Sequence, residues 1–204
     1  MTEEQTLSTA RIEAFSDGVF AIVITLLVLE LRVPHIEHGQ DFGELAAAIW
    51  KLMPKFLSFV LSFFFAAIFW AAHHQFFHQF RHSTRGLLWF NNLFLLSLIF
   101  LPFPTALLGE YPDNKFAVMF FGLEMIFVIS TQKLLRWYGA FKAKLLKPEA
   151  SEADVKRALV AGIYSVAAYI FAVIVCLLIS PTAAIGIYFM VPLLYMLSQR
   201  RTEN

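Results

Sequence analysis

Six long runs of apolar residues divide this sequence, and they restrict its fold more than any other feature. They cover residues 15–31, 45–72, 87–108, 116–131, 158–179 and 181–197. A helix needs about 20 apolar residues to cross the hydrocarbon core of a bilayer. Inside that core every backbone N–H and C=O must be bonded within the protein, which a helix achieves by itself. The sequence therefore predicts an all-α membrane protein with six transmembrane helices per subunit, forming one domain over residues 1–204.

The composition agrees with a membrane protein and argues against several other classes. Of the 204 residues, 59% are hydrophobic, and the mean hydropathy is +0.66. The net charge is only +1, and we find no glycine-rich phosphate loop, so nothing indicates a nucleic-acid or nucleotide partner. The single cysteine, Cys176, lies in an apolar run and offers neither a disulfide framework nor a cysteine metal site. We expect the lipid bilayer as the surroundings, and no cofactor.

Basic residues predict the orientation of the six spans. Twelve Lys and Arg residues fall on the side that holds the N-terminus, the second and fourth loops and the C-terminus. The other side holds only four, which are Arg32, Lys51, Lys55 and Lys115. Because cytoplasmic loops carry the excess of Lys and Arg, both termini are predicted to be cytoplasmic. No basic segment with a small-residue cleavage site precedes the first run, so we expect that run to be retained.

Prolines and a capping pattern predict where some helices break or begin. The second run is long and contains Pro54, so its first turns are expected to lie at the interface. Pro102 and Pro104 are expected to bend or end the third helix. Ser151, followed by Asp154, is typical of a helix N-terminus with an acidic first turn, here that of the fifth helix.

The first span has two different faces when it is drawn as a helix at about 100° per residue. The residues within about 40° of Ile22 are Phe15, Gly18, Leu26 and Leu29. Thr25 lies about 60° from Ile22, and Asp17 about 140°. An unpaired carboxylate in lipid costs several kcal/mol, so Asp17 must face protein or water. This pattern fits an ordinary packed helix, and it also fits a helix whose apolar face lines a pore while Asp17 ties it to its own subunit.

The first span also carries a signature. Arg11 is followed after three residues by Phe15-Ser16-Asp17, and then by the apolar run that ends at Glu30. Further positions that match the same pattern are Trp70, His73, Asn91 and residues 102–105. The whole chain resembles the prokaryotic relatives of transmembrane protein 175, the endolysosomal potassium channel family. The first-helix signature is the more specific part of this resemblance, and the later motifs are weaker individually.

The resemblance implies a function. It implies a homotetramer in a prokaryotic cell membrane that conducts potassium and other monovalent cations as a leak-type channel, with the first helix of each subunit lining the pore. Ile22 matches the constriction position, Leu26 and Leu29 match further apolar layers, and Thr25 matches a polar hydroxyl layer. The signature residues of the structural network are Arg11, Phe15, Ser16, Asp17, Trp70, His73 and Asn91. Of these, Asp17, Trp70, His73 and Asn91 are expected to meet and fix the first helix in place.

The physics of an apolar pore indicates what such a channel can do. We find no Thr-Val-Gly-Tyr-Gly loop, so no carbonyl-lined potassium filter is encoded. A ring of branched alkyl side chains offers an ion no oxygen ligands, so passage requires partial dehydration. Potassium holds its water less tightly than sodium, and we therefore expect a modest preference for potassium. Rotation of such a ring also provides a hydrophobic gate that closes by dewetting.

Two other classes of function stay open. Asp17, Glu124 and the histidines suit a secondary transporter or a proton pathway, because ionisable groups inside a membrane mark such routes. His74, His78 and His82 repeat at every fourth residue and share one helix face, as metal ligands do in a membrane enzyme. Such an enzyme needs several histidine boxes, and only this row is present. We therefore expect neither an enzyme nor a bound metal.

Overall fold

The computed structural model describes residues 8–35 and 41–200, and within these ranges the chain is helical, as predicted. Eight α-helices occur there, and a π-helical turn, Tyr138–Lys142, extends the sixth. The helices are α1 (Thr9–Val28), α2 (Phe42–Lys51), α3 (Met53–Phe77), α4 (Arg85–Phe100), α5 (Pro102–Glu110), α6 (Lys115–Trp137), α7 (Glu152–Leu178) and α8 (Pro181–Arg200).

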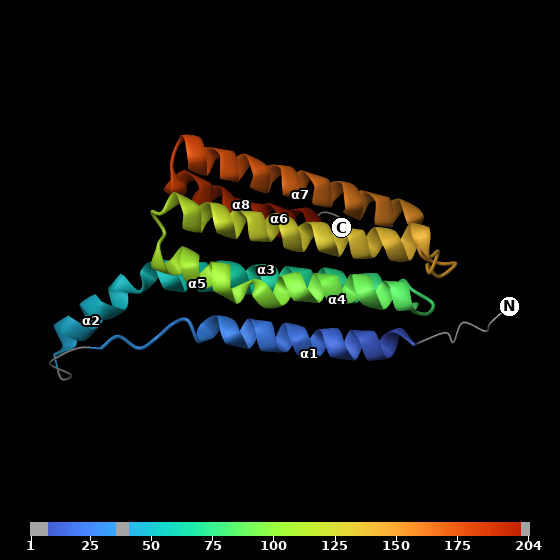
Figure 1. Ribbon diagram of the computed structural model, residues 1–204, viewed down its shortest axis with the longest axis horizontal. Helices are drawn as coiled ribbons and strands as arrows, with labels where there is room; N and C mark the ends of the chain where they lie inside the picture. Colours follow the sequence, from blue (N-terminus) through green and yellow to red (C-terminus); the bar gives the residue numbers. More distant parts are fainter. Residues whose placement is uncertain (1–7, 36–40, 201–204) are drawn as a thin grey trace.

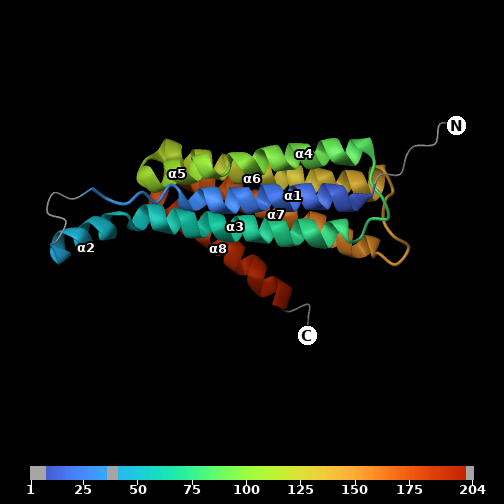
Figure 2. The ribbon, with the colours of Figure 1, turned by 90° about the horizontal axis from the view of Figure 1, so that it is seen from below.

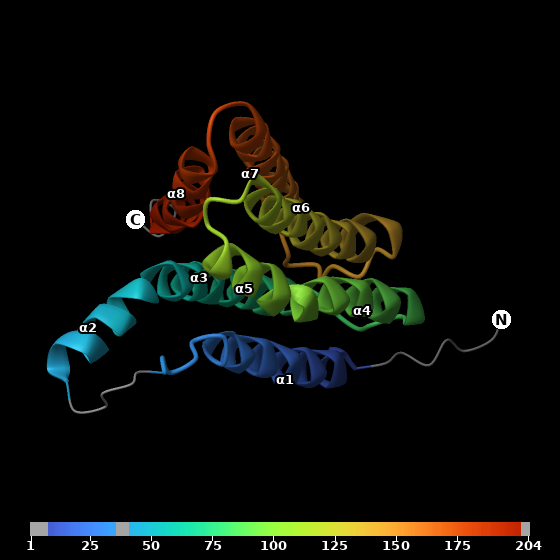
Figure 3. The same ribbon diagram turned by 60° about the vertical axis from the view of Figure 1, so that its left-hand side comes forward.

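The long helices lie in three layers along the long axis of the molecule (Figure 1). α1 forms the first layer, α3, α4 and α5 the middle one, and α6, α7 and α8 the third (Figure 3). α1 packs on α3, α4 and α5 of the middle layer, and α7 packs on α6 and α8. α2 extends beyond the end of the bundle, and α8 leans away from its neighbours (Figure 2). As a result, the described part of the chain covers α1 on one side only.

Aromatic side chains join the three layers. The ring of Phe20 on α1 lies 6.0 Å from that of Phe94 on α4, measured between centroids, and Phe94 lies 6.4 Å from Phe69 on α3. Phe65 on α3 in turn meets Tyr169 on α7 edge-to-face at 6.0 Å. All five side chains are buried. Rings in these arrangements stabilise the packing beyond the area that they bury.

The second predicted span is divided in two. The sequence predicts one run over residues 45–72, whereas the structure ends α2 at Lys51 and starts α3 at Met53. Pro54 explains the division, because it lacks an N–H and its ring clashes with the carbonyl four residues earlier. α2 has its own N-cap, Asp41, and none of its residues is buried. The interior helix is therefore α3 alone, which continues five residues past the predicted end, to Phe77.

Prolines also divide the third predicted span, at Leu101 between α4 and α5. α5 then crosses α3 at close range, where Thr105 Oγ1 lies 2.7 Å from Ser62 Oγ. One turn later a Cβ on Gly109 would lie 2.6 Å from Ser58 Oγ and 2.9 Å from the Cα of Lys55. Small residues at such a crossing let two helix backbones approach closely.

The fourth and fifth predicted spans correspond to α6 and α7, and both helices are longer than predicted because their polar residues have hydrogen-bond partners. The sequence ends the fourth span at Thr131, but α6 continues to Trp137. Gln132 Nε2 donates to the carbonyl of Phe69 at 3.1 Å, and Arg136 Nη2 donates to that of Ala72 at 3.1 Å. α7 begins at Glu152 rather than at residue 158, and the predicted cap is confirmed, since Ser151 Oγ accepts from the backbone N–H of Asp154 at 3.2 Å.

Four stretches of the described chain are long and apolar enough to cross a membrane. They are Met53–Phe77, Arg85–Glu110, Lys115–Lys142 and Glu152–Leu178. α1 has 20 residues, which is about 30 Å of helix, but it carries Arg11, Glu13 and Asp17. α8 contributes a shorter apolar stretch, Pro181–Leu194. The topology of six crossings therefore stays a prediction.

Candidate functional site: the first helix and its two faces

One face of α1 is buried against the middle layer. Its buried residues are Ile12, Ser16, Phe20, Val23 and Leu27. They recur every three or four residues, which places them in one stripe along the helix. The single hydroxyl among them is Ser16, which donates to the carbonyl of Ile12 at 2.8 Å. Because that bond uses the only hydroxyl hydrogen, Ser16 can act only as an acceptor toward its other neighbours.

A buried chain of hydrogen bonds runs from Ser16 into the middle layer. Asn91 Nδ2 on α4 donates to Ser16 Oγ at 3.0 Å, and Asn91 Oδ1 lies 2.8 Å from His73 Nε2 on α3. An amide oxygen only accepts, so His73 must carry a proton on Nε2. The ring of His73 contacts those of Phe77 and Phe94, with centroids 4.4 and 5.8 Å away. This chain fixes three helices relative to one another.

A second attachment joins α1 to α3 at the surface. Trp70 Nε1 donates to Asp17 Oδ1 at 2.9 Å, and both side chains are exposed. The Trp70 ring also stacks on that of His74, with centroids 5.8 Å apart and planes 18° apart. Asp17 and Asn91 are therefore held in two neighbouring attachments, and the amide of Asn91 bonds to Ser16 rather than to Asp17. The sequence predicts that Asp17, Trp70, His73 and Asn91 meet as one group, whereas the observed bonds form two pairs, Asp17 with Trp70 and Asn91 with His73, and Ser16 joins the second pair through Asn91.

The opposite face of α1 is uncovered by the described part of the chain. Phe15, Ile22 and Leu29 are 61%, 59% and 66% exposed, and Leu26 is 40% exposed. A Cβ added at Gly18 would have no atom within 4 Å. These are the residues that share the apolar face of the helical wheel. Large apolar side chains in a continuous exposed stripe indicate a surface that meets another protein chain or lipid.

Thr25 is the polar member of the uncovered face. Its hydroxyl points back to its own helix, with Oγ1 2.9 Å from the carbonyl of Ile22 and 3.0 Å from that of Ala21. The hydroxyl hydrogen is therefore directed to the backbone. The oxygen keeps lone pairs for a ligand on the exposed side.

The remaining ionisable candidates lie in two other places. Glu124 is buried on α6, and its Oε1 has no hydrogen-bond partner among the described residues. The middle layer separates α6 from α1 (Figure 3), so Asp17 and Glu124 occupy different parts of the bundle.

The histidine row is broken, because α3 ends at Phe77 and His82 follows the turn beyond it. The prediction of one shared face is wrong for His82, while His74 and His78 stay adjacent.

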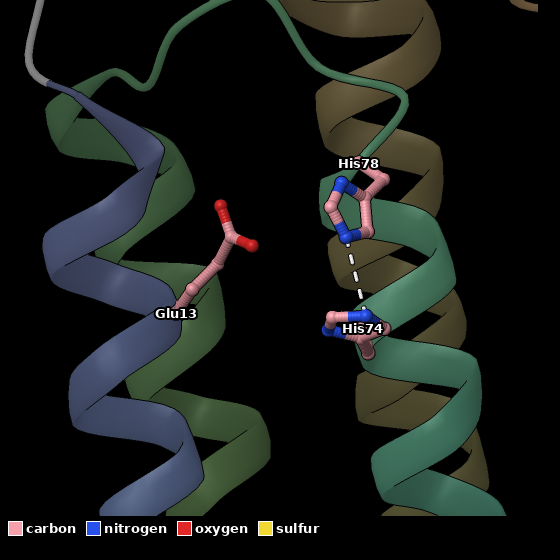
Figure 4. A group of neighbouring side chains, drawn as sticks. All are labelled: Glu13, His74 and His78. Atoms are coloured by element: carbon pink, nitrogen blue, oxygen red, sulfur yellow. Dashed lines mark hydrogen bonds between the residues drawn. The ribbon is translucent and has the colours of Figure 1, made fainter.

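Glu13 is a residue near this site whose contact with α3 the sequence did not predict. It lies one turn before Asp17 on α1, and its carboxylate approaches His74 and His78 at the C-terminal end of α3 (Figure 4). Its spacing of four residues from Asp17 is a signal that was available, because residues at i and i+4 share a helix face. The face that carries Asp17 toward Trp70 thus also carries Glu13 toward the histidines.

Comparison with known proteins identifies the family. The family model described as "Endosomal/lysosomal potassium channel TMEM175" matches residues 11–102, which include most of α1 and all of α2, α3 and α4. A potassium channel of Chamaesiphon minutus is 35% identical over 151 residues, which cover 72% of this chain and 73% of the relative. A potassium channel of a Chryseobacterium species is 30% identical over 202 residues, 97% of each chain. This chain belongs to the TMEM175 family.

The fold agrees with that assignment. The crystal structure of a lysosomal potassium-selective channel TMEM175 homologue from Chamaesiphon minutus superposes with a TM-score of 0.80 at 30% sequence identity. The match covers 93% of this chain and 97% of the homologue. The family predicted from the first-helix signature is therefore confirmed, and the uncovered face of α1 belongs to a member of the TMEM175 family.

Proposed function

We propose that this TMEM175 member is a potassium channel of a prokaryotic cell membrane, formed by four copies of the chain around a pore that their α1 helices line. Its relatives from two bacterial sources are named potassium channels, which supports the choice of ion. The channel is of the leak type and conducts other monovalent cations less well. No enzymatic step is part of this proposal.

The observation that carries the proposal is the contrast between the two faces of α1. One face is attached to its own subunit through Ser16 and Asp17. The other, centred on Ile22, is apolar and uncovered by the described chain. A helix held on one side and bare on the other suits a position at a symmetry axis, and closed symmetry is the usual arrangement of identical subunits.

The constriction works by dehydration. Four Ile22 side chains around the axis form an apolar ring, and Leu26 and Leu29 add further apolar layers. An ion crossing the ring loses part of its water without replacement, which costs less for potassium than for sodium. Thr25 lies three residues after Ile22 and exposes a hydroxyl oxygen, so its layer supplies the nearest oxygen ligands. Selectivity is therefore modest, and turning the ring gates the pore by dewetting.

The proposed topology has six crossings and cytoplasmic termini. The proposed crossings are α1, α3, α4 together with α5, α6, α7 and α8. They alternate in direction along the bundle, which brings the start of α1 and the C-terminal half of α8 toward the same end (Figure 1). Lys and Arg are concentrated in the loops at that end. α1 is long enough to cross, and its charged residues lie in its first half, where the attachments to α3 and α4 are. In this arrangement lipid surrounds the third layer, which α6, α7 and α8 form.

Substitution of Ile22 tests the proposal. Ile22→Ala and Ile22→Asn widen or wet the ring, and we expect larger potassium currents in liposome recordings and a reversal potential shifted toward lower potassium preference. Val28→Ala is the matched control, because Val28 is also apolar and exposed but lies about 120° around α1 from Ile22. Unchanged currents and an unchanged reversal potential in both Ile22 variants contradict the pore assignment.

Glu124 favours a second candidate function. A buried carboxylate whose Oε1 lacks a partner among the described residues is a common feature of proton pathways and secondary transporters. The same liposomes separate the two functions. A transporter gives saturable flux that depends on a counter-ion, whereas the channel gives currents that rise with voltage and resolve into single-channel steps.

A further inference from the structure

Three metal-binding side chains converge where α1 meets α3. Figure 4 shows the carboxylate of Glu13 directed from α1 toward the imidazoles of His74, on α3, and His78, the C-cap residue of α3. Each residue offers a ligand atom, and these atoms all lie within 4.8 Å of one another. Glu13 is half-buried, and the two histidines are exposed. The group is therefore accessible to an ion from the aqueous side.

The two imidazoles are already near the spacing of metal ligands. His74 Nε2 and His78 Nε2 lie 3.1 Å apart. Two nitrogens bound to one tetrahedral Zn²⁺, each at about 2.05 Å, lie about 3.3 Å apart. A neutral imidazole carries one N–H, so placing that hydrogen on Nδ1 in both rings leaves both Nε2 lone pairs for an ion. Zn²⁺ would replace the hydrogen bond between the two rings, and the three side chains would move closer from separations of up to 4.8 Å.

Neighbouring contacts hold the ligands in place. The ring of His74 stacks on Trp70, one turn earlier on α3. Trp70 in turn donates to Asp17, one turn after Glu13 on α1. Because α1 and α3 pack side by side, this bond sets the register that brings Glu13 opposite the histidines. Fixing ligand orientation through neighbouring hydrogen bonds and packing is how proteins tune metal sites.

We propose that Glu13, His74 and His78 form a binding site for Zn²⁺, completed by water in the fourth position. Two imidazoles and one carboxylate are a known ligand set for zinc with an open position. Glu13 also supplies the negative charge that offsets the cation. The sequence predicted no metal because it offered only the histidine row, and the third ligand comes from a helix more than 60 positions away in the chain.

A metal at this site links two helices. Glu13 belongs to the helix with the uncovered Ile22 face, whereas His74 lies on α3 and His78 is the C-cap residue of α3. Zn²⁺ therefore adds a third attachment of α1 to its own subunit, beside the bonds of Asp17 and Ser16. A ligand that binds only the folded state raises its stability, so the bridge is measurable as a change in melting temperature.

Calorimetry on the purified full chain tests the site. The protein, freed of any affinity tag and treated with EDTA, is titrated with ZnCl₂ in detergent. We expect one Zn²⁺ per chain and a higher Tm with zinc. In Glu13→Gln and in the double variant His74→Ala/His78→Ala, affinity falls by more than about tenfold, since loss of even a residue that orients a ligand costs roughly 10–100-fold. Glu13→Gln also loses the zinc-dependent rise in Tm.

The matched control is His82→Ala, which removes a histidine from the same sequence row but outside the cluster and leaves affinity unchanged. Because Glu13→Gln keeps the shape of the side chain, it remains informative if the double histidine variant fails to fold. Absence of saturable zinc binding, or equal affinity in wild type and Glu13→Gln, overturns the site. Potassium flux measured on the same preparation keeps this outcome separate from the proposed function, since zinc binding requires no conduction.

Discussion

Asn91 has the most constrained environment among the polar residues of the site. Its amide donates to Ser16 and accepts from His73, so both ends of the side chain are used. All three residues are at most 2% exposed, and water therefore cannot replace a lost partner easily. Leaving a buried donor or acceptor unpaired costs more than a hydrogen bond gains.

Asn91→Ala should therefore destabilise the subunit by about 1–3 kcal/mol, because it removes the partner of His73 and Ser16 at once. Thermal unfolding of the purified protein, followed by tryptophan fluorescence, measures this as a lower Tm. Asn92→Ala is the control, since Asn92 is the same residue type at the next position and only half-buried. Equal Tm values for the two variants are incompatible with a structural role for the Ser16–Asn91–His73 chain.

For single residues, the sequence predicts the helix face on which a side chain lies better than the residues that it contacts on other helices. The helical wheel separates Ile22 and Asp17 correctly, because both positions lie in one regular helix. The wheel does not reveal that Ser16 receives Asn91, or that Glu13 meets His74, since those pairs depend on the register between helices. Glu124 shows the same limit, because its burial depends on how α6 packs in the bundle.

Among the described residues, the bond of Asp17 to Trp70 is an exposed attachment of α1 to α3, beside the buried bond between Ser16 and Asn91. The bond to Trp70 lies on the side of α1 away from Ile22. Removing it therefore loosens the attachment of the helix without altering the face proposed to line the pore. The consequence falls on folding and assembly rather than on the choice of ion.

We predict that Asp17→Ala lowers the yield of assembled channel, with a loss of about 1 kcal/mol for the missing hydrogen bond, while the assembled fraction keeps its potassium preference. Size-exclusion chromatography and reversal potentials measure the two quantities. Asp17→Asn keeps an oxygen that accepts from Trp70 and should restore much of the yield. A normal tetramer yield with altered selectivity would place Asp17 in the ion path instead.

At the element scale, the sequence predicts breaks that have a local cause. Pro54 and Pro102 mark the divisions between α2 and α3 and between α4 and α5, and Ser151 marks the start of α7. The sequence ends the fourth span at residue 131, whereas α6 continues to Trp137 and includes Gln132 and Arg136. Their bonds to α3 carbonyls keep the helix continuous, and no local pattern contains those partners.

For the whole molecule, the three layers leave α1 at one edge and α7 at the opposite edge (Figure 3). Both expose large apolar side chains, but the proposal gives these surfaces different neighbours. The α1 face meets other subunits at the axis, and the α7 face meets lipid. Exposed apolar residues alone do not determine the number of subunits, because they suit a protein interface and a bilayer equally.

Cysteine cross-linking distinguishes these neighbours. In a Cys176→Ala background, Ile22→Cys and Ile163→Cys place a thiol at the same residue type with similar exposure, 59% and 66% for the native side chains. Disulfides form only when the two Cα atoms approach within about 7 Å, which four α1 helices around a narrow axis bring about and lipid-facing positions on α7 do not. Mild oxidation should therefore give dimers on non-reducing gels for Ile22→Cys and monomers for Ile163→Cys. Cross-linking of Ile163→Cys without cross-linking of Ile22→Cys would place α7, rather than α1, at the axis and would contradict the pore assignment.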